Sequence, residues 1–168
     1  VGISGVMARN TKIMALNVFG NSQGAASANI DTAIRYAADM GAKIINMSLG
    51  GRGATPSTES AILYAVGKGV TVVVAAGNDS ATLTASTFYT PASYGAAIDG
   101  MITIGATDSN PASVGALCSF SNRSSTYVEL GAPGCDTSQS SMGVLSLLRN
   151  NSYGLMAGTS MASPVAAG

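Results

Sequence analysis

The amino-acid sequence predicts an α/β fold with a mainly parallel sheet. Segments with the apolar pattern of β-strands alternate with segments that have the 3.6-residue period of helices. Glycines end several of these segments, and small residues are abundant, which suits close packing of helices on a sheet. Because a parallel connection needs a crossover of a dozen or more residues, this alternation indicates parallel strands with helices on both faces.

The first predicted strand is residues 12–18, where aliphatic side chains alternate with polar ones. Residues 27–40 follow as a helix, since their apolar side chains recur at the spacing of one helical face. Either Ser27 or Asn29 would cap the beginning of this helix, and Gly41 would end it. This segment has the clearest helical pattern in the chain.

Three more strands and one more helix follow. Residues 43–48 form the next predicted strand, and residues 57–68 form the next helix, which Gly69 would end. Residues 70–76 are mostly apolar, as in a strand that is buried on both faces. Residues 101–106 repeat that character.

Two long segments, residues 80–100 and 108–151, lack a helical period, and we expect loops and short antiparallel strands in them. No linker separates them from the rest, so residues 1–168 are expected to form a single domain. Cys118 and Cys135 would either form one disulfide or remain buried thiols. They cannot complete a zinc site, because the chain has no histidine.

The charge and hydropathy of the chain exclude two classes of partner. Eight basic and eight acidic residues give no net charge, so nothing predicts binding to nucleic acid or to an anionic membrane surface. The apolar runs are far too short to span a bilayer.

Polar groups next to glycines follow three predicted strands. Leu49 and Gly50 follow the strand at 43–48, Gly77 and Asn78 follow the strand at 70–76, and Gly158 to Ser160 follow an expected strand at 153–156. In open parallel sheets, ligands bind beyond the carboxyl ends of the strands. The sequence therefore predicts a binding site formed by these three segments.

Ser160 and Asn78 each have a structural interpretation as well as a chemical one. Ser160 would begin a helix, either as an ordinary N-cap or as a nucleophile next to amides that favour an oxyanion. Asn78 would either occupy a turn before Asp79 or point its amide into a cleft. For each residue taken alone, the structural interpretation is the more common one.

Taken together, three segments resemble the subtilisin-like serine proteases. Residues 158–164 match the family's nucleophile motif, residues 75–78 its oxyanion-asparagine motif and residues 46–50 its substrate-strand motif, in the family's order. The resemblance covers nearly the whole chain. It implies the family's three-layer fold, with a mainly parallel sheet, incomplete at both ends.

The resemblance also implies a secreted serine endopeptidase, which hydrolyses polypeptide substrates through an acyl-enzyme on Ser160. The Ser160 amide and the Asn78 side chain would stabilise the oxyanion, and the chemistry would need no cofactor. The substrate-binding residues that the resemblance implies are Ser48, Leu49, Gly50, Ala75, Ala76 and Gly77.

This chain departs from the family's pattern at the general base. A serine nucleophile needs a base, and this chain has no histidine. Asp31 comes nearest to the family's Asp-Thr-Gly setting, but Ala33 replaces the glycine, and we reject it as the triad aspartate. The family's order places both partners before Ser160. We therefore expect a fragment cut at both ends. It would be inactive alone and active only with the upstream segment of the same protein or a complementary chain.

A metal site is not expected in this chain. Glu129 matches a region where some relatives bind a weak cation, but one carboxylate makes an inadequate site, and a solvated surface residue is the preferred interpretation. Structural calcium would belong to the complete protein, because the family's stronger calcium loop would lie upstream.

Three alternatives remain beside this reading. The non-enzymatic one is a catalytically dead, peptide-binding member or remnant of the family. Related acid-active peptidases use a glutamate base, but their oxyanion donor is typically aspartate, whereas Asn78 is present here. A Ser–Lys mechanism would need Lys12, Lys43 or Lys68 in the cleft, yet these lie at strand starts or at a helix end.

Overall fold

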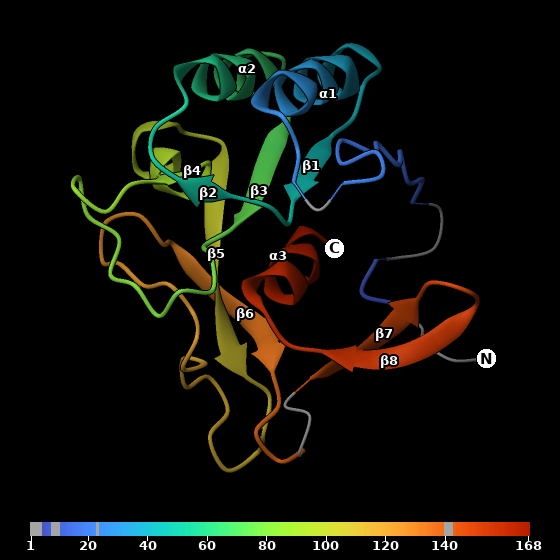
Figure 1. The fold of residues 1–168 in the computed structure, drawn as a ribbon, viewed down its shortest axis with the longest axis vertical. Helices are drawn as coiled ribbons and strands as arrows, with labels where there is room; N and C mark the ends of the chain where they lie inside the picture. Colours follow the sequence, from blue (N-terminus) through green and yellow to red (C-terminus); the bar gives the residue numbers. More distant parts are fainter. Residues whose placement is uncertain (1–4, 8–10, 23, 140–142) are drawn as a thin grey trace.

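The computed structural model describes residues 5–7, 11–22, 24–139 and 143–168 (Figure 1). Three α-helices, eight strands and one 3₁₀ helix are found in these residues. In chain order they are α1 (Ser27–Asp39), β1 (Ile44–Met47), β2 (Gly51–Arg52), α2 (Pro56–Gly67), β3 (Thr71–Ala75), β4 (Tyr89–Thr90), η1 (Ala92–Ala97), β5 (Met101–Asp108), β6 (Leu130–Cys135), β7 (Val144–Leu148), β8 (Ser152–Met156) and α3 (Thr159–Ala167).

Four strands form one parallel sheet, in the order β1, β3, β5 and β6. Because all four run in the same direction, their carboxyl ends meet at one edge of the sheet, where Met47 pairs with Val74 and Ala75 pairs with Ile104. The predicted α/β class with a mainly parallel sheet is confirmed. Short antiparallel pairs, β2 with β4 and β7 with β8, lie outside this sheet.

Helices cover both faces of the parallel sheet (Figure 1). α1 and α2 pack on one face, and α3 packs on the other. Side chains of β3 point alternately to the two faces. Val72 and Val74 join the core that contains Ile62 of α2, whereas Val73 joins the core that contains Ala162 of α3.

Both N-terminal helices form where the apolar period predicted them, but α1 begins differently. Its N-cap is Ala26, which makes no side-chain capping bond, so the predicted caps Ser27 and Asn29 are wrong. Both residues lie inside the first turn, because the Asn29 amide already donates to the Ala26 carbonyl. The end of the helix is as predicted, with Gly41 in the left-handed region at φ +83°.

The predicted strand at residues 12–18 is wrong. Residues 12–17 are exposed, and within the described part of the chain no strand pairs with them. An alternating pattern makes a strand only where a neighbouring strand takes up its backbone hydrogen bonds.

Two further differences concern the second half of the chain. β6 was not expected from the sequence, yet it pairs with β5 in the parallel sheet. The expected strand at 153–156 exists as β8, but it pairs antiparallel with β7 and does not belong to that sheet. The short antiparallel strands expected in the two long segments are present as β4 and β7.

A disulfide joins Cys118 to Cys135, with 6.2 Å between the two Cα atoms. It connects the loop after β5 to the end of β6, which settles the pairing that the sequence left open.

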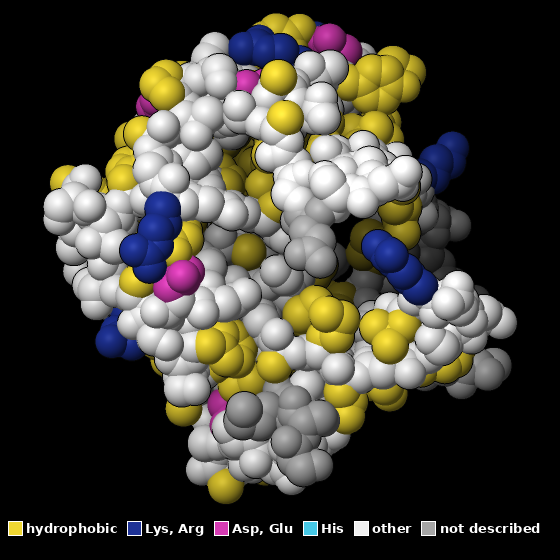
Figure 2. Space-filling view, viewed as in Figure 1, with side chains coloured by type: hydrophobic (Ala, Val, Ile, Leu, Met, Phe, Trp, Pro, Cys, Tyr) yellow, Lys and Arg dark blue, Asp and Glu magenta, His cyan; other side chains and the backbone are white. Residues whose placement is uncertain are grey.

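The surface carries few charges. On the face shown in Figure 2, Lys, Arg, Asp and Glu side chains are scattered among polar and hydrophobic ones. Within the described residues, no helix is long and apolar enough to cross a membrane.

Candidate active site

A cleft of about 340 Å³ opens at the carboxyl ends of β1 and β3, beside the beginning of α3. Strand ends, β4 and the first turn of α3 all contribute to its walls. The residues that line it are Leu49, Gly50, Ala75, Gly77, Asn78, Asp79, Tyr89, Thr90, Ala92, Thr159 and Ser160.

Ser160 is the second residue of α3 and is half-buried. The N-cap of this helix is Gly158, so the interpretation of Ser160 as an N-cap is wrong. The Gly158 amide donates to the carbonyl of Gly134 at 2.8 Å, which anchors the start of α3 to β6. Gly134 must lack a side chain here, since a Cβ would lie 2.8 Å from the Gly158 oxygen. The helix start that carries Ser160 is therefore held against the sheet.

The end of β1 contacts the same helix turn. The Ser48 hydroxyl donates to the Ser160 carbonyl at 2.9 Å and accepts a hydrogen bond from the side-chain Nδ2 of Asn46 at 3.1 Å. The Ser160 hydroxyl lies 3.5 Å from the Ser48 carbonyl, at the outer limit for a hydrogen bond. The Ser160 hydroxyl is thus held only loosely and is free to accept a stronger partner.

Asn78 lies just past the end of β3, with its side chain bonded to the start of α3. Its Oδ1 accepts hydrogen bonds from the amide of Thr159 at 2.8 Å and from the hydroxyl of Thr159 at 2.9 Å. The same hydroxyl accepts a bond from the Gly77 amide at 3.1 Å. Among the described residues no acceptor binds Asn78 Nδ2, so that side of the carboxamide can donate to a ligand in the cleft.

The structure brings together most of the residues that the sequence singled out. Ser160, Asn78, Leu49, Gly50, Ala75 and Gly77 line one cleft. Ser48 contacts Ser160 without lining the cleft, and Ala76 is fully buried behind it, with its amide bonded to the Ile104 carbonyl.

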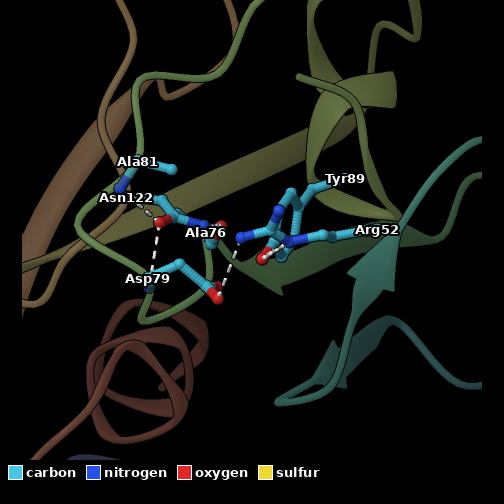
Figure 3. A network of polar contacts seen from close by, with 6 residues as sticks. All are labelled: Arg52, Ala76, Asp79, Ala81, Tyr89 and Asn122. Carbon is cyan, nitrogen blue, oxygen red and sulfur yellow. Dashed lines mark hydrogen bonds and ion pairs between the residues drawn. The ribbon is translucent and has the colours of Figure 1, made fainter. Parts of the chain in front are cut away.

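Sequence reasoning missed a polar group at the edge of the cleft, formed by Arg52, Asp79 and Tyr89 (Figure 3). Asp79 and Tyr89 line the cleft, whereas Arg52 does not. Arg52 lies 3.8 Å from Asp79 and donates from Nε to the Tyr89 hydroxyl at 3.3 Å. Burial raises the pKa of the Tyr89 phenol above its usual value. Pairing of β2 with β4 places Arg52 opposite Tyr89, a contact that no local pattern announces.

Asn122 was also missed by sequence reasoning. It is 0% exposed, and its side chain bonds to the backbone on both sides of Asn78 (Figure 3). It comes from the segment between β5 and β6, where the sequence shows no periodic pattern.

Within the described residues no group of three or more Cys, Asp or Glu side chains could hold a metal ion. Glu129 is an exposed residue, but its carboxylate accepts a hydrogen bond from the Thr103 amide at 2.6 Å. Neither Lys43 nor Lys68 lines the cleft, and Lys68 pairs with Asp39.

Comparison with known proteins gives consistent matches over nearly the whole chain. A family model described as the Subtilase family matches residues 2–168. The thermophilic serine proteinase of Bacillus sp. strain AK1 is 42% identical over 167 residues, which cover 99% of this chain and 36% of that protein. The halolysin-like extracellular serine protease Nep of Natrialba magadii is 38% identical over 159 residues, covering 95% of this chain and 26% of its own length.

A solved structure shares the fold. The epidermin leader peptide processing serine protease (EpiP) of Staphylococcus aureus superposes with a TM-score of 0.80 at 25% identity, covering 95% of this chain and 47% of the other. This chain therefore spans about half or less of the length of these three proteins.

Proposed function

The chain belongs to the subtilase family, and we propose that it carries the nucleophile of a serine endopeptidase, with the aspartate and histidine of the triad provided by sequence outside this chain. Ser160 is the proposed nucleophile, and the Ser160 amide and Asn78 Nδ2 are the proposed oxyanion donors. The relatives described above are a serine proteinase and a serine protease, which supports a serine protease function for this chain.

One observation carries the proposal. Asn78 binds Thr159 through Oδ1, which leaves Nδ2 available beside Ser160 in the same cleft. Ser160 is the second residue of its helix, and the first amides of a helix have no intrahelical partner. Two N–H donors are therefore available next to one loosely held hydroxyl, which is the arrangement that acyl transfer requires.

The proposed reaction has two steps. Ser160 Oγ attacks the peptide carbonyl carbon while a histidine takes the hydroxyl proton, and the carbonyl oxygen becomes an oxyanion that accepts from the two donors. Collapse breaks the C–N bond, and the histidine gives the proton to the leaving amine. Water then attacks the ester of Ser160 by the same route and releases the acid. This chemistry needs no cofactor.

Polypeptides are the proposed substrates. Leu49 and Gly50, at the end of β1, would lie beside an extended peptide, and the small residues Ala75 and Gly77 would leave room for an apolar side chain. We also propose an extracellular location, as in the relative named an extracellular protease.

The test joins this chain to a segment that carries the family's aspartate and histidine. A fluorophosphonate probe should then label Ser160, and a peptide substrate should be cleaved, whereas the chain alone should do neither. Ser160→Ala should abolish both signals, and Ser146→Ala, at an exposed serine of β7, should keep them. Tight peptide binding without labelling or cleavage in the joined protein would favour the alternative, a catalytically inactive peptide-binding member of the family.

A further inference from the structure

We propose that Asn122 is a positioning residue that holds the turn after β3 so that Asn78 faces the start of α3. The claim that this placement serves catalysis rests on the proposed function, in which Asn78 is an oxyanion donor. The claim that Asn122 fixes the turn stands on its own contacts.

The side chain of Asn122 replaces the sheet as the hydrogen-bond partner of this turn. Its Oδ1 accepts from the amides of Asp79 at 3.0 Å and Ala81 at 2.9 Å, and its Nδ2 donates to the Ala76 carbonyl at 2.9 Å. The backbone amide of Asn122 donates to the Gly77 carbonyl at 2.9 Å. These four bonds lie on both sides of Asn78 in the chain, and Figure 3 shows the Asn122 side chain next to Ala76, Asp79 and Ala81.

The need for such a partner follows from where β3 stops. Ala76 still donates its amide to Ile104 of β5, but from Gly77 on the chain leaves the sheet. Backbone groups that leave a buried strand need new partners. A carboxamide is a neutral group whose nitrogen donates hydrogen bonds and whose oxygen can accept two. The Asn122 side chain uses both its nitrogen and its oxygen here.

Packing leaves Asn122 little freedom to shift. A Cβ on Gly77 would lie 2.4 Å from Asn122 Nδ2, and Gly77 has φ +101°, so only glycine permits the observed approach. Asn78 is therefore held through its neighbours' backbone by Asn122 and through its own side chain by Thr159. Loss of Asn122 would leave the second contact alone.

The ion pair between Asp79 and Arg52 does not provide the same support. The two side chains are 40% and 75% exposed and lie 3.8 Å apart. Exposed pairs of this kind stabilise a fold only weakly, because water screens them. Asn122 is fully buried, and its bonds are shielded from that competition.

The first experiment measures amide hydrogen exchange in the chain itself, for Asn122→Ala, Asn122→Leu and Ser121→Ala. Both Asn122 variants remove the acceptor of the Asp79 and Ala81 amides, so these amides should exchange faster while β5 keeps wild-type rates. Asn122→Leu keeps the approximate side-chain size if Asn122→Ala fails to fold. Ser121 is equally buried and bonds to the Ala106 amide, so it controls for the loss of a buried polar group. Unchanged exchange at Asp79 and Ala81 in the Asn122 variants would overturn the proposal.

The second experiment measures peptide hydrolysis by the joined protein. Asn122→Ala should lower kcat by up to about 10²-fold, as for an ångström-scale misplacement of a catalytic group, and change KM little. In an Asn78→Ala background the same substitution should cause no further loss of kcat, because Asn122 acts through Asn78. Equal losses in both backgrounds would overturn the positioning role. If the wild-type joined protein hydrolyses nothing, the proposed function fails, and the exchange experiment still decides whether Asn122 holds the turn.

Discussion

The centre of the sheet, β3 and β5, and the N-terminal segment, residues 11–22, contain similar aliphatic side chains in opposite surroundings. Ile104 in β5 is 0% exposed, whereas Ile13 in the N-terminal segment is 77% exposed. Both segments show apolar patterns typical of strands. Among the residues that the structure describes, strands pair with both sides of the sheet centre, whereas none pairs with residues 12–22. The comparison shows that a segment with the sequence pattern of a strand forms a strand only where neighbouring strands pair with it.

The β7–β8 hairpin lies between these extremes. Its backbone is paired along five residues of each strand, yet Leu147 is 65% exposed and Tyr153 is 50% exposed. Strand pairing and side-chain burial are therefore separate conditions, and of the three regions compared the sheet centre meets both. The proposed catalytic groups are attached to the sheet centre or to α3, which packs on it.

The largest difference in stability should come from replacing an isoleucine by alanine in each of the two regions. Ile104→Ala should lower the free energy of unfolding by about 2–5 kcal/mol, because it empties a buried site. Ile13→Ala should change it by less than about 0.5 kcal/mol. Urea unfolding of both variants measures the difference. Equal losses would break the comparison, since they would mean that the N-terminal segment is packed as tightly as the sheet centre.

Removing the disulfide tests how far the stability of the sheet centre depends on its neighbours. The double variant Cys118→Ala/Cys135→Ala opens a loop with a sequence separation of 17, for which we expect a loss of about 3 kcal/mol. Reduction of the wild-type protein should reproduce the loss in urea unfolding. An unchanged midpoint in both cases would show that the hydrogen bonds between β5 and β6 suffice.

A smaller effect should follow from adding one methyl group at the end of the sheet centre. Gly77→Ala should cost about 1–3 kcal/mol, through backbone strain and the clash with Asn122. Gly67→Ala is the matched control, because Gly67 ends α2 with open space around it, and it should stabilise the chain by up to about 1 kcal/mol. Thermal unfolding compares the two. Equal stabilities for both variants would mean that the turn after β3 yields easily.

The smallest effect should appear as a pH dependence at the carboxyl end of β5. Asp108 is 4% exposed, and hydrogen bonds from the Ser113 and Thr137 hydroxyls and the Asn110 amide hold the pKa of its carboxyl well below the usual range. A lowered pKa in the folded state stabilises the protein above about pH 4, the pKa expected in the unfolded chain, and this contribution is lost as the pH falls toward the folded-state pKa.

Asp108→Asn should therefore be less stable than the wild type at pH 7, and the difference should shrink at pH 3. The measurement is urea unfolding at both pH values, with Asp99→Asn, at an exposed aspartate, as the control. A difference that grows toward acid would contradict the assigned direction of the pKa.

Much of the sheet centre could be predicted from sequence, because periodicity reports directly on burial. The runs that became β3 and β5 are mostly apolar, and the face of α1 repeats at helical spacing. β6 was not predicted from the sequence, because glycines and Pro133 interrupt its apolar pattern. Proline is tolerated there since β6 is an end strand of the sheet, so pairing with β5 outweighs local propensity.

Some residues of the candidate site could likewise be predicted from the sequence, and others could not. Ser160 and Asn78 could be identified because each follows a predicted strand within a recognisable motif. Asn122 could not, since a buried asparagine in an irregular segment looks like any loop residue until the turn that it supports is in place. The contact of Arg52 with Tyr89 was hidden for the same reason, because it depends on the pairing of β2 with β4.

The position of β1 has a consequence for handling the protein. Among the strands that the structure describes, β1 is an end strand of the parallel sheet, and Ile44 on it is 49% exposed. The open side of an end strand presents backbone groups that can pair with a strand from another molecule, and an apolar side chain there strengthens the contact. The isolated chain should therefore aggregate as its concentration rises, and Ile44→Lys, which places a charge on that edge, should keep it in solution at concentrations where the wild-type chain precipitates.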